Sequence, residues 1–427
     1  LALDVTSGVY SVSAFLGGII EWIYMVPDRL YVAWRPPISV YYISLKILEY
    51  MLMQGYITRE EFEEYKQIIN EGRGDEVKNR ILQKIPPHFT LSTLIDYIDE
   101  TTFLVLDISK LEVSCRGLFK VPGNVLDQFA MEEYSVGGDR FMVIATTLNK
   151  YRLEVYAWRY SSALPQDVVI LVEEHGTGTR VSPVIVTRTV TVDMSEKTRE
   201  IYVQAGWFVN VIPVDTSNNV YIVDEKLNII ANLTDLARSE RIFAARLIKN
   251  ILYLVTFRLV DPLFAIDLSN PHKPRVLGYL KIPGFSEYLH PLSEDRLLGI
   301  GLERFLKISL FDISDPTNMS EVAKLLITVL VDSELFRNHR AFMIDPRYEY
   351  FAFPVTILYT KEEFVIIEGF IIVKYSLENN MLTLFKVVNL EKPMRALYIG
   401  DTLYLIGYSR TLIFKIPEFI TQGEITY

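Results

Sequence analysis

One structural unit recurs along the chain, and its period constrains the fold more than any other feature. The unit opens with an apolar strand, a tight turn and a second apolar strand, as in FAARLIKNILYLVTF (Phe243–Phe257). A third strand, often ending in Asp, and a fourth strand follow, as in Phe264–Gly284. Consecutive turns lie about 45 to 54 residues apart, at Asn250, Asp295, Arg347 and Asp401. This spacing is typical of the blades of a propeller.

The repeat therefore predicts an all-β fold, a β-propeller of four-stranded antiparallel blades. Strands such as RLLGIGL (Arg296–Leu302) are almost continuously apolar, as expected where both faces of a sheet are covered by neighbouring sheets. Six full units are readable, and Leu1–Gly18 resembles the second half of another unit. We expect six to eight blades, and we expect residues before Leu1, an export signal among them, to lie outside this sequence.

Two insertions of roughly 60 residues interrupt the repeat, since the first turns lie about twice the usual period apart. Propeller residues are expected at 1–39, 100–149 and 216–427, with a helical insertion at 40–99 and a strand-rich insertion at 150–215. The strand-like segments of the second insertion either extend the sheet of their blade or form a small β lobe. Insertions of this kind are tolerated because each blade contacts only its neighbours.

The helical insertion carries clear start signals. Thr58 opens TREEFEEYKQIINEG, a capping-box pattern with acidic residues in the first turn. The preceding segment, ISLKILEYMLMQGY, has apolar residues at helical spacing and is also expected to be a helix. We also expect Thr90 or Ser92 to cap a short helix that ends at Tyr97.

Composition narrows the classes of partner. The net charge of −10 argues against a nucleic-acid-binding protein, which needs a basic face to neutralise phosphates. No transmembrane segment is expected, because the longest helical apolar stretch, Tyr41–Ile57, is too short and carries Lys46 and Glu49. The single cysteine, Cys115, excludes an intrachain disulfide, and we expect it to be a small buried hydrophobe within a strand.

Several runs resemble a known family, the archaeal and bacterial secreted proteins with a C-terminal β-propeller domain. The runs that carry the resemblance are Phe119–Tyr134, Ser217–Ile230, Glu240–Gly301 and Lys307–Asn318. The resemblance extends over nearly the whole chain and implies a propeller fold and an extracellular or cell-surface location. It implies no activity, because the family has none established.

Four residues are candidates for a binding site. His290 lies in the first strand of its hairpin, the innermost position of a blade. There it either lines the central channel or has a structural role through packing and hydrogen bonding. Arg246, Arg258 and Asp261 are expected to form either an ion pair between blades or a ligand-binding patch. No catalytic residues are assigned, because HExxH, GxSxG and P-loop patterns do not occur.

Other polar motifs have structural explanations. The repeated turns at Asp267–Pro271 and Asp312–Pro316 are explained by an Asp side chain that accepts hydrogen bonds from backbone N–H groups of the turn. No metal site and no cofactor are predicted, since no two histidines have ligand spacing. Asn232 and Asn318 match the N-glycosylation acceptor pattern.

The sequence thus favours a non-enzymatic, extracytoplasmic binding or scaffold protein whose protein or glycan partner is unknown. Two alternatives stay open. One is a hydrolase or lyase in the central channel, which requires carboxylates, His or Arg to converge on the innermost strands. The other is an accessory domain that docks a partner through the helical insertion.

Overall fold

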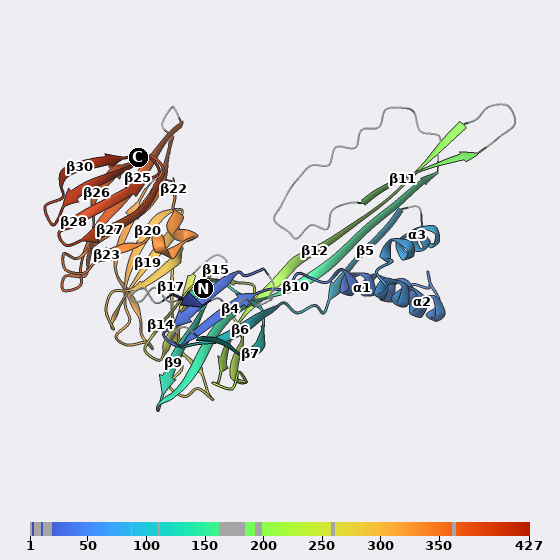
Figure 1. The fold of residues 1–427 in the computed structure, drawn as a ribbon, viewed down its shortest axis with the longest axis horizontal. Helices are drawn as coiled ribbons and strands as arrows, with labels where there is room; N and C mark the ends of the chain where they lie inside the picture. The colour runs from blue at the N-terminus through green and yellow to red at the C-terminus, as the bar shows by residue number, and fades with distance from the viewer. Residues whose placement is uncertain are drawn as a thin grey trace.

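Six antiparallel sheets form the body of the molecule in the computed structural model (Figure 1); four of them have four strands, one has five and one has seven. The structure describes residues 2–3, 10–11, 19–86, 88–109, 112–161, 184–192, 199–257, 261–328, 330–360 and 364–427. Side chains are described within these ranges except at 2–3, 10–11, 109, 158–161, 184–192, 199–207, 261, 330, 358–360 and 364–365. The predicted all-β propeller fold with a helical insertion is confirmed.

We number the sheets blade 1 to blade 6 in chain order. Blade 1 contains β3 (Trp22–Val26), β4 (Arg29–Trp34), β6 (Glu100–Ser109) and β7 (Glu112–Pro122). Blade 2 contains β8 (Asn124–Val125), β9 (Met131–Val136), β10 (Asp139–Ser161), β12 (Arg199–Val223) and β13 (Ile229–Leu236). Blade 3 contains β14 (Arg241–Ile248), β15 (Ile251–Phe257), β16 (Asp261–Asp267) and β17 (Arg275–Ile282).

The remaining blades follow the same order from the innermost to the outermost strand. Blade 4 contains β18 (Phe285–Pro291), β19 (Arg296–Glu303), β20 (Phe305–Asp312) and β21 (Ser320–Ile327). Blade 5 contains β22 (Leu330–Asp332), β23 (Met343–Asp345), β24 (Tyr350–Thr360), β25 (Phe364–Ser376) and β26 (Met381–Asn389). Blade 6 contains β27 (Pro393–Ile399), β28 (Thr402–Gly407), β29 (Arg410–Lys415) and β30 (Ile420–Thr426). A separate pair, β1 (Ala2–Leu3) and β2 (Tyr10–Ser11), falls in the predicted half unit.

Hydrophobic packing between neighbouring sheets holds the blades together. One buried cluster joins blades 1, 2 and 3, and others join blades 3 and 4, blades 4 and 5, and blades 5 and 6. The predicted Asp turns follow the third strands of blades 3 and 4. In them, the Asp267 carboxylate accepts a hydrogen bond from the N–H of Ser269 at 2.9 Å, and the Asp312 carboxylate accepts one from the N–H of Ser314 at 3.0 Å. These turns are therefore structural, as expected.

An arm projects from blade 2, because β10 and β12 continue beyond the blade as one long ribbon (Figure 1). A register shift between Lys150 and Tyr151 marks the point where the ribbon leaves the blade. Beyond it, β5 (His88–Ile95) pairs with β10, and β11 (Val184–Val192) pairs with β12. The described strands of the strand-rich insertion thus extend the sheet of their blade, one of the two arrangements expected, while residues 162–183 and 193–198 lie outside the described residues. The domain boundaries themselves stay predictions.

Three helices pack on this ribbon (Figure 1). They are α1 (Val40–Met53), α2 (Arg59–Asn70) and α3 (Gly74–Lys84). Thr58 caps α2 as predicted, since its hydroxyl accepts from the N–H of Glu61 while the Glu61 carboxylate accepts from the N–H of Thr58. The arm has its own core, with Leu48, Met51 and Leu91 fully buried, and that core is separate from those of the blades.

Two local predictions are wrong. The segment after α3 is the strand β5, not a helix capped by Thr90 or Ser92, because Phe89 and Leu91 are buried whereas Thr90 and Ser92, which alternate with them, are exposed. Cys115 is exposed, not buried, because β7 is the outermost strand of its blade.

Three short 3-10 helices lie near the inner strands. They are η1 (Gln128–Ala130), η2 (Glu334–Phe336) and η3 (His339–Ala341). Within the described ranges, no helix is both long enough and apolar enough to cross a membrane.

Candidate functional site

Arg246 and His290, two of the residues proposed from sequence, meet between the innermost strands of blades 3 and 4. Arg246 lies on β14 and His290 on β18. The Arg246 guanidinium donates from Nε and Nη2 to the carbonyl oxygen of Leu289, at 3.2 and 2.9 Å. It also stacks on the ring of Phe129 in η1, with 3.6 Å from the guanidinium carbon to the ring centroid. Arg246 thus links three elements, β14, β18 and η1.

The surroundings of His290 keep its ring neutral. Burial and then the charge of Arg246 lower the pKa of His290 to about 4. Its Nδ1 lies 3.1 Å from the hydroxyl of Tyr288, and burial raises the pKa of that hydroxyl to about 12. At neutral pH this pair therefore consists of an uncharged imidazole and an intact phenol.

Two carboxyl groups of the same region were missed by sequence reasoning. Asp127 accepts from the N–H groups of Phe129 at 2.8 Å and Ala130 at 3.1 Å, so it caps η1, and burial raises its pKa. Glu132 lies on β9, where burial raises its pKa to about 7 despite the nearby Arg246. Its position on the first strand of a hairpin is the signal that could have selected it, since the same reasoning selected His290.

A second histidine of the site comes from blade 5. His339 begins η3, and its Nε2 lies 2.8 Å from the side-chain nitrogen of Gln128 in η1. Its ring meets the edge of Phe129 with 4.9 Å between the ring centroids. Burial, followed by the charges of Arg340, Arg246 and Arg395, lowers the pKa of His339. Blades 2 and 5 are therefore joined through η1 and η3.

These residues form what we call the axial cluster: Asp127, Gln128, Phe129, Glu132, Arg246, Tyr288, His290 and His339. It brings acid–base groups of the inner strands, Glu132, Arg246 and His290, together with Asp127 and His339 at 3-10 helices. The enzyme alternative requires such groups to converge on the innermost strands. The cluster also forms internal contacts between blades, the arrangement required by a structural role. Among the residues that the structure describes, no group of three or more His, Cys, Asp or Glu side chains could hold a metal ion.

The other candidates from sequence lie elsewhere. Arg258 is outside the described residues, and for Asp261 only the backbone is described. Asp261 starts β16 and pairs with Ile282 of β17, whereas Arg246 pairs with Tyr253 of β15. The backbone register thus places Asp261 two strands outward from β14, and a patch of Arg246, Arg258 and Asp261 stays a prediction.

Both glycosylation candidates have exposed side chains. Asn232 lies on β13, the outermost strand of blade 2, and Asn318 lies in the turn that leads to β21. The hydroxyl residues of the two patterns, Thr234 and Ser320, are exposed as well. Each acceptor is therefore accessible on the rim of the propeller.

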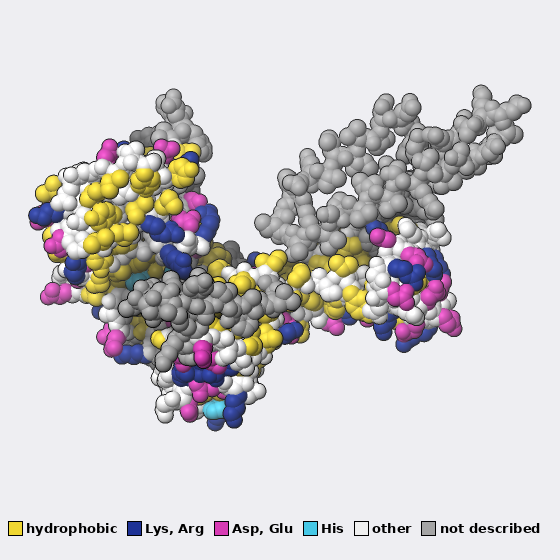
Figure 2. Space-filling view, in the orientation of Figure 1, with side chains coloured by type: hydrophobic (Ala, Val, Ile, Leu, Met, Phe, Trp, Pro, Cys, Tyr) yellow, Lys and Arg dark blue, Asp and Glu magenta, His cyan; other side chains and the backbone are white. Residues whose placement is uncertain are grey.

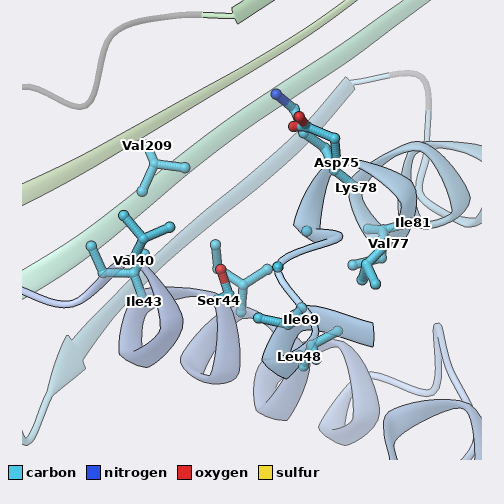
Figure 3. A pocket seen from close by; sticks show the side chains of 13 residues that line it. Val40, Ile43, Ser44, Leu48, Ile69, Asp75, Val77, Lys78, Ile81 and Val209 are labelled. Carbon is cyan, nitrogen blue, oxygen red and sulfur yellow. The ribbon is translucent and has the colours of Figure 1, made fainter. Parts of the chain in front are cut away.

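A cavity of about 370 Å³ opens in the arm between α1, α3 and β12 (Figure 3). Its floor is apolar and includes Ile47, Leu48 and Val77, all buried. Its rim carries Val40, whose side chain is 68% exposed, together with the polar residues Ser44, Asp75 and Lys78. The volume and the mixture of apolar wall and few polar groups are those of a ligand or side-chain pocket.

Comparison with known proteins yields relatives without an assigned activity. An uncharacterized protein of Methanocaldococcus jannaschii is 28% identical over 434 residues, which cover 95% of this chain and 57% of the relative. An uncharacterized protein of Archaeoglobus fulgidus is 37% identical over 209 residues, which cover 49% of this chain and 31% of the relative. The chain therefore spans little more than half the length of one relative and matches about a third of the other.

Similarity to solved structures is low. A putative dipeptidyl aminopeptidase IV from Bacteroides ovatus aligns with 76% of this chain and 49% of its own, at 9% identity and a TM-score of 0.34. Hsv2 of Kluyveromyces lactis aligns with 51% of this chain and 59% of its own, at 13% identity and a TM-score of 0.25. At the level of sequence, residues 1–418 match the family described as the beta propeller domain, and the chain belongs to that family.

Proposed function

We propose that this protein is a non-enzymatic binding or scaffold protein that acts outside the cytoplasm and engages a protein partner through its arm. The observation that carries the proposal is the open cavity between α1, α3 and β12 (Figure 3). The arm stands clear of the blades (Figure 1), so a partner can reach the cavity without contacting the propeller. The propeller then serves as the rigid base of the binding element.

The chemistry of the cavity favours an apolar side chain next to a carboxylate. The floor offers aliphatic side chains, so an apolar group that enters it is removed from water. Lys78 lies at the rim, and within the described part of the chain it forms no ion pair, whereas Arg73, Arg80 and Lys84 are paired with glutamates. A lysine with no ion pair among the described residues, beside an apolar pocket, suits an acidic, apolar segment of a protein.

Site-specific crosslinking tests the docking proposal. A photo-reactive phenylalanine analogue at Val40 is expected to capture a partner in cells of the source organism, and the same analogue at the exposed Glu63 of α2 is the control. The captured protein is identified by mass spectrometry and its affinity is then measured with purified components. Equal adducts at both positions, or none, would overturn the docking proposal.

A charge reversal tests the role of Lys78. Lys78→Glu is expected to weaken binding of the identified partner at least about tenfold, because the introduced carboxylate would repel the carboxylate of the partner. Lys66→Glu on α2 is the matched control and is expected to leave the affinity unchanged. If Lys78→Glu binds the partner with unchanged affinity, Lys78 does not recognise a carboxylate of the partner.

The location outside the cytoplasm has its own test. Fractionation of the source cells, followed by intact-mass measurement, is expected to find the protein outside the cytoplasm. If the export pathway glycosylates it, the mass should fall in Asn232→Gln and Asn318→Gln variants. Recovery from the cytoplasmic fraction alone would contradict this part of the proposal.

The axial cluster supports one second candidate, a hydrolase or lyase. The specific observation is Glu132, whose pKa of about 7 suits a general acid or base at neutral pH, close to Arg246. A panel of ester, peptide and glycoside substrates would test it, with Glu132→Gln as the inactive variant. Turnover that Glu132→Gln abolishes would favour an enzyme, and turnover equal in both proteins would exclude Glu132 as its acid or base.

A further inference from the structure

The first strand of blade 5 is interrupted, unlike those of blades 3, 4 and 6. β22 pairs with β24 as far as Asp332, and β23 resumes the pairing at Met343. Between these residues the chain leaves the sheet and forms η2 and η3. Within the stretch of β24 that lacks a first-strand partner, the carbonyl oxygen of Pro354 accepts from the Ser333 hydroxyl at 2.6 Å. A proline suits such a stretch, because it has no N–H that a missing strand would leave unsatisfied.

A cavity of about 480 Å³ lies at this interruption, between blade 5 and the start of β27 in blade 6. Blade 5 contributes Thr356 and Glu368 to its wall, and blade 6 contributes Lys392, Arg395 and Tyr408. Most of the lining side chains are polar, whereas the floor of the cavity in the arm is aliphatic. The volume is that of a small-molecule site. No described residue of the arm lines this cavity, so a ligand here is independent of the partner proposed for the arm.

The carboxylates of this cavity already accept hydrogen bonds from the protein. Both oxygens of Asp332 lie 3.0 Å from Nη2 of Arg337. Glu368 accepts from the backbone N–H of Lys392 at 2.6 Å. Glu334 accepts from the side-chain nitrogen of a neighbouring asparagine at 3.3 Å. Each carboxylate keeps further lone pairs, so it can still accept from a hydroxyl group of a ligand.

Two cations of the cavity pair with no carboxylate among the described residues. The Lys392 ammonium lies over the ring of the exposed Tyr408, 5.1 Å from its centroid. The Arg395 guanidinium, which is partly buried, donates from Nη1 to the carbonyl oxygen of Met394 at 2.7 Å. A carbonyl oxygen and an aromatic ring leave both positive charges uncompensated, and a cavity with such charges attracts an anion.

Further basic groups lie between the cavity and the axial cluster. Figure 2 shows Lys and Arg side chains gathered where Figure 1 places the helical turns of blade 5, drawn in orange. Arg340 of η3 is exposed and forms no ion pair with a described residue. Next to burial, which is the larger cause, the charges of Arg340, Arg246 and Arg395 lower the pKa of His339. This positive region stands out in a protein whose net charge is −10.

We propose that the cavity between blades 5 and 6 binds an acidic sugar, a hydroxylated ring that carries a carboxylate. The carboxylate of the sugar pairs with Arg395 and Lys392, and the guanidinium offers it several donors in one plane. The hydroxyl groups of the sugar donate to Glu334 and Glu368 and reach the Thr356 hydroxyl. An acidic peptide fits less well, because it brings carboxylates but few hydroxyl donors for the carboxylates of the cavity.

Calorimetric titration of the protein with sodium glucuronate and sodium galacturonate tests the proposal. At least one of the two is expected to bind with a millimolar or lower Kd, and glucose much more weakly, because glucose lacks the carboxylate. Oligomers of the same acids distinguish the source of the ligand: tighter binding of an oligomer indicates a polysaccharide, and equal binding a free acid. Binding of neither acid would overturn the proposal. Inorganic phosphate or a glutamate-rich peptide that binds as tightly as the acid sugars would overturn it too.

Two substitutions assign the binding to this cavity. Lys392→Gln and Arg395→Gln are each expected to raise the Kd of the acid sugar at least about fivefold, because each removes one charged donor. Lys281→Gln on blade 3 is the matched control, since Lys281 is also exposed and lies over the ring of Tyr279 but does not line the cavity. Lys392 is exposed, so its variant is expected to keep the Tm of the wild type even if Arg395→Gln is less stable. An unchanged Kd in Lys392→Gln, or an equal rise in Lys281→Gln, would place the sugar elsewhere and overturn the proposal.

Discussion

The guanidinium group of Arg246 lies over the ring of Phe129, with 3.6 Å between the guanidinium carbon and the ring centroid. Arg246 belongs to blade 3, whereas Phe129 belongs to the 3-10 helix that leads into blade 2. The same guanidinium donates two hydrogen bonds to the Leu289 carbonyl of blade 4. One side chain thus connects three consecutive blades near their inner strands.

We expect Arg246→Ala to lower the free energy of unfolding by about 2–4 kcal/mol, because it removes the cation–π contact and leaves a carbonyl without its donors. Urea denaturation measures the change. The matched control is Arg241→Ala on the exposed end of the same strand, which should cost within about 0.5 kcal/mol. The variant should also raise the pKa of His290, which NMR titration can follow; an unchanged pKa would contradict the electrostatic role of Arg246.

Glu132 makes stability depend on pH in the direction opposite to most carboxylates. Its pKa rises from 4.5 to about 7 on folding, so the folded protein binds the proton more tightly than the unfolded chain. Stability contributed by the protonated group is therefore present below about pH 4.5 and is lost as the pH rises to about 7. The full loss corresponds to up to about 3 kcal/mol.

Glu132→Gln should therefore be more stable than the wild type at pH 8 and nearly equal to it at pH 4.5. Its amide oxygen can still accept from the N–H of Leu247, which lies 3.4 Å from the Glu132 carboxylate. Chemical denaturation across this pH range measures the effect, and the exposed Glu112→Gln is the control. Parallel pH profiles for wild type and Glu132→Gln would show that Glu132 does not titrate in this window.

The propeller and two of the eight residues of the axial cluster could be predicted from sequence because they depend on a repeated local pattern. The hairpin pattern places Arg246 and His290 on first strands, and first strands are innermost in every blade. Gln128 and His339 lie in irregular 3-10 helices outside that pattern, so their contact across 211 residues could not be foreseen. The pKa values of the cluster's side chains likewise depend on how deeply each one is buried, and the spacing of the repeat does not predict this.

The arm shows a second limit of sequence reasoning. Its helices α1 to α3 were predictable from apolar spacing and from the capping box at Thr58. The strand β5 was mistaken for a helix because Thr90 and Ser92 are common helix caps, whereas the alternation of Phe89 and Leu91 with polar residues carried the correct signal. That strand pairs with β10, more than 50 residues away in the chain, and packs in the core of the arm, and neither partner can be read from the segment alone.

Blades 1 and 2 share a buried ion cluster whose removal should be costly. Glu133 lies 3.4 Å from the Arg29 guanidinium and accepts a hydrogen bond from the Tyr31 hydroxyl, and both Glu133 and Arg29 have almost fully buried side chains. Glu133→Ala should lower the free energy of unfolding by about 3–5 kcal/mol, because part of the Arg29 charge is left unpaired in the interior. Differential scanning calorimetry measures the change.

The control for that prediction is an exposed pair of the same chemistry. Arg410 and Glu424 lie 3.4 Å apart on blade 6 with both side chains about half exposed. Glu424→Ala should cost no more than about 1 kcal/mol, since water screens such pairs. Similar costs for the two alanine variants would mean that the Arg29 cluster gains nothing from burial.

Asp99 fixes the joint between the arm and the propeller. Its carboxylate is buried and accepts from the side-chain nitrogens of Asn124 at 3.0 Å and Asn149 at 2.8 Å, and from the Tyr151 hydroxyl at 2.7 Å. Tyr151 follows the register shift at which β10 leaves blade 2. Asp99→Ala removes the common acceptor of all three donors, so we expect the arm to move more freely against the blades.

Small-angle X-ray scattering measures that motion as a broader distribution of interatomic distances in Asp99→Ala than in the wild type. Hydrogen exchange should rise at the ends of β5 and β10 near the joint, while the inner strands of blades 3 and 4 keep their protection. Asp96→Ala is the control, because Asp96 lies three residues earlier but is exposed, and its partners among the described residues are Lys46 and Tyr42 of α1. Identical scattering from Asp99→Ala and the wild type would mean that the ribbon of β10 and β12 alone sets the direction of the arm.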